Sequence, residues 1–131
     1  MKPEIKKLWI DALLSGEYEQ GRGVLCRADD GKKEWCCLGV LTDLAIKAGI
    51  VMEIKMSDDP SNPYTVFFDD AHEKLPVKVQ EWSGIETDLG EYSYEDINID
   101  DEDIFIAGTL AEDNDNGTTF EQLVSIIESY F

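Results

Sequence analysis

The chain has 131 residues and no lysine or arginine after Lys78. Residues 1–78 hold 14 acidic and all 11 basic residues, whereas residues 79–131 hold 15 acidic residues. The formal charges of the two parts are therefore −3 and −15, within a net charge of −18 at pH 7. Proteins that bind nucleic acid through its phosphates need a surface rich in lysine and arginine. We therefore expect no direct nucleic-acid binding.

The sequence also lacks a long apolar run, a secretory start and a disulfide framework. No stretch approaches the roughly 20 apolar residues of a membrane span, and the first residues do not follow the pattern of a signal peptide. The chain has three cysteines, two of them adjacent as Cys36-Cys37. An odd number of cysteines does not form a disulfide framework and is typical of proteins of a reducing cytosol. We expect a cytoplasmic protein of one domain, residues 1–131, without membrane contact.

Periodicity predicts alternating helices and strands in the N-terminal half. Residues 3–14 and 38–48 have apolar side chains at helical spacing; in the first helix these are Ile5, Leu8, Trp9, Ala12 and Leu13. Residues 76–82 are predicted to form a short helix, because Pro76 suits its first turn and Gly84 its end. Residues 24–37 are typical of a β-hairpin, because Asp30-Gly31 supplies two positions that tolerate positive φ. That turn would pair Arg27 with Glu34 and Cys26 with Trp35. Residues 50–56 and 64–68 are predicted strands on either side of a loop.

The C-terminal half is harder to interpret. Part of residues 86–103 is predicted to form an edge strand. Residues 104–112 are ambiguous, because the acids that precede Ile104 favour a helix start whereas Gly108 disfavours a helix. Residues 112–117 are predicted to turn into a last helix, where Thr118 and Glu121 have the spacing of a capping box. The whole pattern indicates an α+β fold in which helices pack on a small, mostly antiparallel sheet.

The densest charge lies between residues 86 and 103, which hold nine acids and no base. Such a segment can dock on a basic protein groove, because complementary fields accelerate association. A solvated, solubilising surface is the alternative. The predicted partner-binding residues are Glu86, Asp88, Glu91, Glu95, Asp96, Asp100, Asp101, Glu102 and Asp103.

A second candidate site would bind a small nucleotide-like ligand. Helix N-termini at Cys37-Leu38-Gly39 and Gly117-Thr118-Thr119 present backbone N–H groups that can hold a phosphate, although self-capped helices are the simpler explanation of both. Phosphate binding also needs cations, and all of them lie in the N-terminal part. The predicted ligand residues are Gln20, Arg22, Arg27, Lys32, Lys33, Asn114, Asp115, Asn116 and Thr118.

Other reactive residues have simpler explanations. Cys36-Cys37 lacks metal-ligand spacing and a nearby histidine, so we expect both thiols in the core. His72, the only histidine, lies in a polar loop and is expected to be solvated. Asp113, Asp115 and Gly117 look like the start of a calcium loop, but the register places Leu123 where a bidentate glutamate is needed. We expect no metal and no cofactor.

Several short motifs of the chain match one recurring family pattern. The matching pieces are Trp9 with Leu13, Ser15-Gly16-Glu17-Tyr18-Glu19-Gln20-Gly21, Leu25, Cys36-Cys37-Leu38-Gly39-Val40-Leu41, Leu75-Pro76, Trp82, and Leu110-Ala111-Glu112-Asp113-Asn114-Asp115-Asn116-Gly117-Thr118-Thr119-Phe120. With these motifs the chain resembles a family of small, uncharacterised phage and prophage proteins, and the resemblance covers nearly the whole chain. One departure is Asp113, where the family pattern has an apolar residue. The resemblance implies a phage origin and a setting in the infected bacterial cytoplasm, and it brings no catalytic residues.

Four functions remain open at this stage. The first is a non-catalytic, anti-defence type of interference protein that binds a basic host protein through its acidic C-terminal part. The second is a binder that sequesters a nucleotide-derived immune signal. The third is a small hydrolase that uses two carboxylates with separated pKa values. The fourth is a small structural or assembly protein. The sequence favours binding over catalysis and leaves the oligomeric state open.

Overall fold

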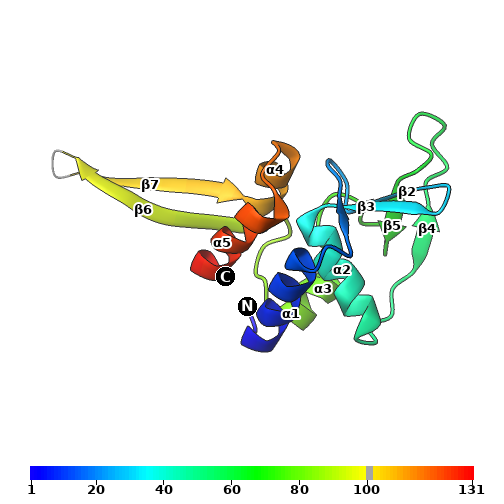
Figure 1. The fold of residues 1–131 in the computed structure, drawn as a ribbon, viewed down its shortest axis with the longest axis horizontal. Coiled ribbons are helices and arrows are strands. Elements are labelled where there is room, and N and C mark those ends of the chain that lie inside the picture. Colours follow the sequence, from blue (N-terminus) through cyan, green and yellow to red (C-terminus); the bar gives the residue numbers. More distant parts are fainter. Residues whose placement is uncertain (100–101) are drawn as a thin grey trace.

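Short helices and three small sheets make up the fold, which confirms the predicted α+β class. The computed structural model describes the backbone of residues 1–99 and 102–131, and it describes no side chains between residues 94 and 106. In chain order (Figure 1) the elements are α1 (Pro3–Leu14), β1 (Glu19–Gln20), β2 (Cys26–Asp29), β3 (Lys32–Trp35), α2 (Cys37–Lys47), β4 (Ile54–Met56), β5 (Val66–Phe68), α3 (Val77–Ser83), β6 (Glu91–Ile99), β7 (Glu102–Thr109), α4 (Leu110–Asp115) and α5 (Phe120–Tyr130).

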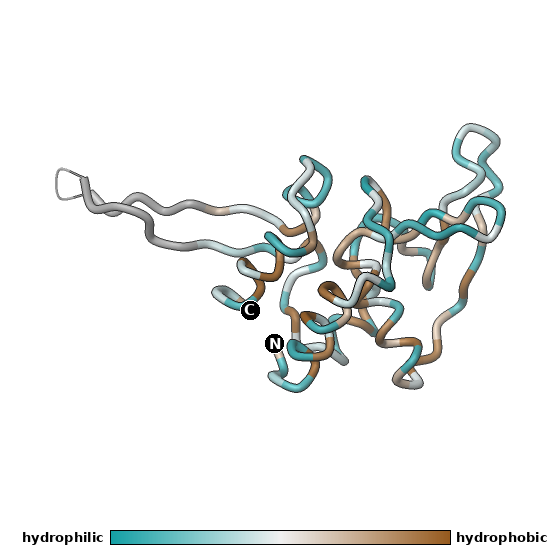
Figure 2. The backbone as a smooth tube through the Cα atoms, viewed as in Figure 1, coloured by the Kyte–Doolittle hydropathy of each residue, from teal (hydrophilic) through white to brown (hydrophobic). Residues whose placement is uncertain are grey.

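The core forms where α1 packs against α2 and α5, and Figure 2 shows apolar residues in each of these helices. Helix α1 buries Ile5, Trp9 and Leu13. The Trp9 indole is fully buried and donates from Nε1 to the carbonyl oxygen of Cys37 at 2.9 Å. Leu8 was predicted on the same face but is 50% exposed, because the neighbouring helices cover only the line through the three buried residues.

The predicted hairpin is confirmed, including its register. Strands β2 and β3 are antiparallel, with Cys26 opposite Trp35 and Arg27 opposite Glu34. The turn residues Asp30 and Gly31 have φ values of 53° and 82°, as a two-residue hairpin turn requires. The ladder is shorter than predicted, because Cys37 begins α2 instead of ending a strand. Strand β1 adds to β3 in parallel, giving the order β1-β3-β2.

A second small sheet lies beside this hairpin. Strands β4 and β5 are antiparallel, with Ile54 opposite Phe68, so the predicted strand over residues 50–56 is reduced to its last three residues. An isolated bridge between Arg27 and Thr65 joins β2 to the chain just before β5. The two sheets therefore meet along β2, at the end of the molecule farthest from β6 and β7 (Figure 1).

The helix start that the acids before Ile104 favour does not occur. Residues up to Thr109 form β7, which pairs antiparallel with β6, and only Leu110 begins a helix. Cross-strand pairing with a distant segment outweighs the local charge that favoured a helix start. The turn predicted over residues 112–117 is likewise mostly helix α4.

The capping box of the last helix lies one residue later than predicted. The Thr119 side chain accepts from the backbone N–H of Gln122, and the Gln122 side chain accepts from the backbone N–H of Thr119. Both capping positions therefore move from Thr118 and Glu121 to the next residue. No helix in the described part of the chain is long and apolar enough to cross a membrane.

Candidate functional site

The acidic arm, which we define as the hairpin of β6 and β7, extends away from the helical body (Figure 1). Its strands pair with each other and, among the described residues, with no third strand. The register shifts between Glu95 and Ile97, so Asp96 forms a bulge. Five of the predicted acids lie on the arm: Glu91, Glu95, Asp96, Glu102 and Asp103. Glu86 and Asp88 precede the arm, and Asp100 and Asp101 lie outside the described residues.

Aromatic residues that the sequence analysis did not single out hold the base of the arm. Tyr92 lies opposite Gly108 on the partner strand, and a Cβ at Gly108 would approach the Tyr92 hydroxyl to 2.7 Å. The Tyr92 ring stacks on Tyr130 with 5.4 Å between centroids and 18° between planes. Its hydroxyl donates to the carboxylate of Asp113. Tyr92 therefore contacts both α4 and α5, and β7 continues directly into α4.

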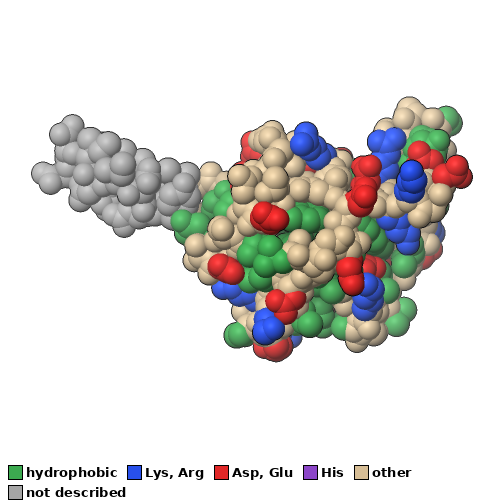
Figure 3. All heavy atoms as spheres, viewed as in Figure 1, with side chains coloured by type: hydrophobic (Ala, Val, Ile, Leu, Met, Phe, Trp, Pro, Cys, Tyr) green, Lys and Arg blue, Asp and Glu red, His purple; other side chains and the backbone are tan. Residues whose placement is uncertain are grey.

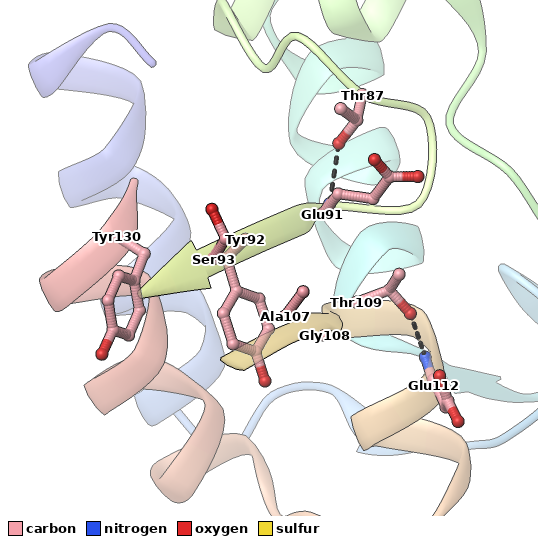
Figure 4. Close-up of a pocket in the computed structure, with 9 residues that line it drawn as sticks. All are labelled: Thr87, Glu91, Tyr92, Ser93, Ala107, Gly108, Thr109, Glu112 and Tyr130. Atoms are coloured by element: carbon pink, nitrogen blue, oxygen red, sulfur yellow. Dashed lines mark hydrogen bonds between the residues drawn. The ribbon is translucent and has the colours of Figure 1, made fainter. Parts of the chain in front are cut away.

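A pocket of about 620 Å³ lies at this base. Figure 4 shows that its two carboxylates, from Glu91 and Glu112, do not point toward each other, and Thr109 lies between them. Both glutamates are exposed. A two-carboxylate hydrolase needs a facing pair that share a substrate or a water, and this pocket does not supply one.

The predicted ligand residues Gln20 and Asn114 bind each other and the main chain. Asn114 is fully buried, and its Oδ1 accepts from Gln20 Nε2 at 2.9 Å and from the Cys37 backbone N–H at 3.2 Å. Its Nδ2 donates to the carbonyl oxygen of Gly21 at 2.8 Å. Gln20 Nε2 also donates to the carbonyl oxygen of Thr118 at 2.7 Å. This network joins the chain after α1 to the end of α4.

Protein groups also occupy the two helix N-termini that were candidates for phosphate binding. Gln20 Oε1 accepts from the first N–H of α5, that of Phe120, at 3.1 Å. At α2, the Cys36 sulfur accepts from the Gly39 N–H at 3.4 Å. A Cβ at Gly39 would lie only 1.8 Å from the carbonyl oxygen of Leu25. Gly39 is therefore required for close backbone packing.

The three cysteines are buried and free, as predicted for core residues. Burial raises the pKa of the Cys26 thiol to about 12 and that of the Cys36 thiol to about 11. Burial also raises the pKa of Cys37 well above its ordinary value. Raised values keep the thiols neutral, whereas a nucleophile or metal ligand must be a thiolate. No group of side chains that could hold a metal ion occurs among the described residues.

The remaining predicted ligand residues separate into different places. Asp115 accepts from the backbone N–H of Gly23 at 2.7 Å and lines another pocket, of about 630 Å³, together with Asn116. Lys32 and Lys33 lie on β3, and the Lys33 ammonium is 6.0 Å from the centroid of the Trp35 ring. In Figure 3, side chains of lysine and arginine gather at the end of the body that holds β2 and β3, opposite the arm, and they are interspersed with acidic side chains.

Of the predicted ligand residues, only Arg22 and Arg27 line a cleft of about 530 Å³, which we call the arginine cleft. Its other walls come from the chain between residues 57 and 73, including Tyr64, Phe67 and His72. The His72 side chain is 41% exposed in its polar loop, and its ring lies 4.7 Å from that of Phe67. The sequence showed these aromatic residues only as strand formers, and nothing in their spacing placed them beside the arginines.

All 131 residues match the sequence model of one family, the domain of unknown function DUF8296, and the chain belongs to that family. No curated protein matches the chain. No solved structure matches it either.

Proposed function

We propose that this DUF8296 protein is a non-catalytic binding protein whose acidic arm docks on a basic surface of another protein. The observation that carries the proposal is the arm itself, two long strands that extend from the body (Figure 1). Residues 86–103 hold nine acids and no base, and five of these acids lie on β6 and β7. A large part of the acidic charge is therefore on a projecting element.

Physical reasoning supports a binding role for such an arm. An isolated two-stranded hairpin is marginally stable in water, and strands of nine and eight residues reach roughly 25 Å. Each strand also has one edge without a strand partner among the described residues, and an unpaired edge can receive a strand from another chain. A basic partner would supply both opposite charge and packing.

The resemblance to phage and prophage proteins supplies the biological setting of the proposal. In that setting the partner is a bacterial host protein with a basic surface, met in the cytoplasm of the infected cell, and the outcome is interference with host defence. Electrostatic attraction of this kind accelerates encounter and weakens as salt rises.

The proposal is tested by capture from a bacterial lysate at about 50 mM and about 500 mM salt, conditions that differ strongly in screening length. The captured proteins are identified by mass spectrometry. We expect basic proteins that are retained at low salt and at least tenfold depleted at high salt. The quadruple variant D100N/D101N/E102Q/D103N should lose them.

A matched control removes the same number of negative charges from the helical body. The variant E4Q/E17Q/E81Q/E128Q neutralises four exposed glutamates and should capture the same proteins as the wild type. If the arm variant captures these proteins as well as the control does, the proposal fails. Circular dichroism of both variants verifies that a loss is not caused by unfolding.

A further inference from the structure

The arginine cleft lies at the end of the molecule opposite the acidic arm and does not participate in the proposed docking. It lies between β2 and the segment from residue 57 to residue 73, and its volume of about 530 Å³ is within the range of about 300–1,000 Å³ that is usual for small-molecule sites. The residues on which the inference depends are Arg22, Arg27, Asp59, Tyr64, Phe67 and His72.

Backbone hydrogen bonds hold the two walls of the cleft together. The Ala28 N–H donates to the carbonyl oxygen of Tyr64 at 2.8 Å, and the Leu25 N–H donates to that of His72 at 2.6 Å. Arg27 and Thr65 form an antiparallel bridge between these two contacts. The arginine and aromatic side chains therefore project from a preformed backbone frame, which lowers the entropic cost of binding a ligand.

The chain has only two arginines, and both line this cleft. Five of the nine lysines pair with a carboxylate. Neither arginine forms an ion pair with any residue whose side chain the structure describes. In a chain with 29 acids, two exposed and unpaired guanidinium groups on one cleft are unusual. Arginine is suited to bind phosphate through two parallel hydrogen bonds.

The aromatic residues provide surfaces on which a planar ring can stack. The Phe67 and His72 rings lie side by side, tilted by 35°, and the Tyr64 ring is 38% exposed. The Arg27 guanidinium lies 5.5 Å from the centroid of the Tyr64 ring, an arrangement that leaves its N–H edge available for an anion. The same cleft therefore combines cationic donors with aromatic faces.

Two carboxylates restrict the class of ligand further. Asp59 and Glu73 also line the cleft, so the two negative charges of these carboxylates balance the two positive charges of the arginines. Asp59 Oδ1 accepts from the Ser61 N–H at 2.9 Å and from the Ser61 hydroxyl at 2.7 Å, which holds the carboxylate in place. A polyanion would be repelled by these acids, whereas a ligand with one phosphate and several hydroxyl or amino groups would use both signs of charge.

We propose that the arginine cleft binds a nucleoside monophosphate. Arg22 and Arg27 bind its phosphate, the rings of Phe67, His72 and Tyr64 contact its base, and Asp59 accepts a hydrogen bond from a hydroxyl or amino group. The site is separate from the acidic arm, so the protein would bind one macromolecule and one small ligand at opposite ends.

Isothermal titration calorimetry on the full chain tests this inference, with AMP, GMP, CMP and UMP as probes. We expect saturable binding of at least one of them, and at least tenfold weaker binding of both inorganic phosphate and the matching nucleoside. Arg22→Gln and Arg27→Gln should each weaken binding tenfold or more, since a charged hydrogen bond contributes about 1.5–3 kcal/mol.

Lys32→Gln is the matched control, because it removes one positive charge from the same hairpin without lining the cleft. Its affinity should stay within twofold of the wild type. The inference is overturned if none of the four nucleotides binds saturably, if inorganic phosphate binds as tightly as they do, or if Lys32→Gln weakens binding as much as the arginine variants. The arm variant D100N/D101N/E102Q/D103N should retain nucleotide binding, which separates this result from the docking proposal.

Discussion

Gln20 and Asn114, 94 positions apart, are joined by a hydrogen bond of 2.9 Å from Nε2 of Gln20 to Oδ1 of Asn114. The buried Asn114 amide also binds the backbone on two sides, at Gly21 and Cys37. A single side chain therefore connects the loop after α1, the start of α2 and the end of α4.

Replacing Asn114 by alanine should lower the free energy of unfolding by about 3–5 kcal/mol. The substitution leaves the Cys37 N–H and the Gly21 carbonyl without their partner in a buried site, and each unsatisfied group costs about 1–3 kcal/mol. Urea denaturation measures the loss. The control is Asn116→Ala, which removes the same type of side chain from an exposed position nearby and should change stability by less than about 0.5 kcal/mol. Equal effects of the two variants would contradict the structural role of Asn114.

Gly39→Ala should destabilise the protein by more than about 3 kcal/mol or prevent folding, because the added methyl group would overlap the carbonyl oxygen of Leu25. Thermal unfolding compares it with Gly16→Ala, where the added group meets open space. Gly16 has a φ of +77°, so its alanine variant should lose only about 1–2 kcal/mol through backbone strain. If the Gly39→Ala variant is as stable as the Gly16→Ala variant, the result contradicts the close packing of α2 against the backbone of Leu25.

The three buried thiols should react with a disulfide reagent only after unfolding. With a pKa of about 11, the Cys36 thiol is about one-thousandth thiolate at pH 8, and its burial blocks access as well. We expect near-zero labelling of the native protein and three labelled thiols in denaturant. Rapid labelling of native protein at pH 8 would show that the cysteines are not in the core.

The raised thiol pKa values also predict a pH dependence of stability. The native state retains these protons more tightly than the unfolded state, so the contribution is fully present below about pH 8.5. It decreases as the pH rises toward the folded value of about 11 for Cys36. Cys36→Ser removes the titrating group and preserves the helix cap, so its unfolding free energy should fall less than that of the wild type over this range.

Asp69 should contribute to stability only above about pH 4. Its pKa is lowered first by the hydrogen bond from the Glu53 backbone N–H and then by the Lys78 ammonium. The contribution is present above the unfolded pKa of about 3.9 and is lost as the pH falls through the lower folded value. Asparagine tolerates the φ of 49° observed here. Asp69→Asn should therefore lose less stability between about pH 5 and about pH 2.5 than the wild type.

The control for this experiment is Asp58→Asn, which changes an exposed aspartate of the preceding loop. Its unfolding free energy at pH 7, measured with urea, should lie within about 0.5 kcal/mol of the wild-type value. A wild-type curve identical to that of Asp69→Asn would mean that the contacts of Asp69 add nothing to folding.

Local signals predicted the parts of the fold whose contacts are close in sequence. The Asp30-Gly31 turn determined the register of β2 and β3, because turn geometry and alternation act over few residues. Residues 104–112 were ambiguous because a strand depends on a partner, and the partner of β7 begins at Glu91. The sequence showed that residues 86–103 are acidic, but it did not show that β6 and β7 extend away from the helical body.

The sequence by itself determined the α+β class, the buried cysteines and the separation of an acidic C-terminal part from a nearly balanced N-terminal part. These properties depend on composition and on patterns within one element. Only the tertiary structure decided that Gln20 and Asn114 bind each other and that both arginines share one cleft with Tyr64, Phe67 and His72. Such groupings depend on backbone hydrogen bonds between segments distant along the chain, for which periodicity within a segment contains no signal.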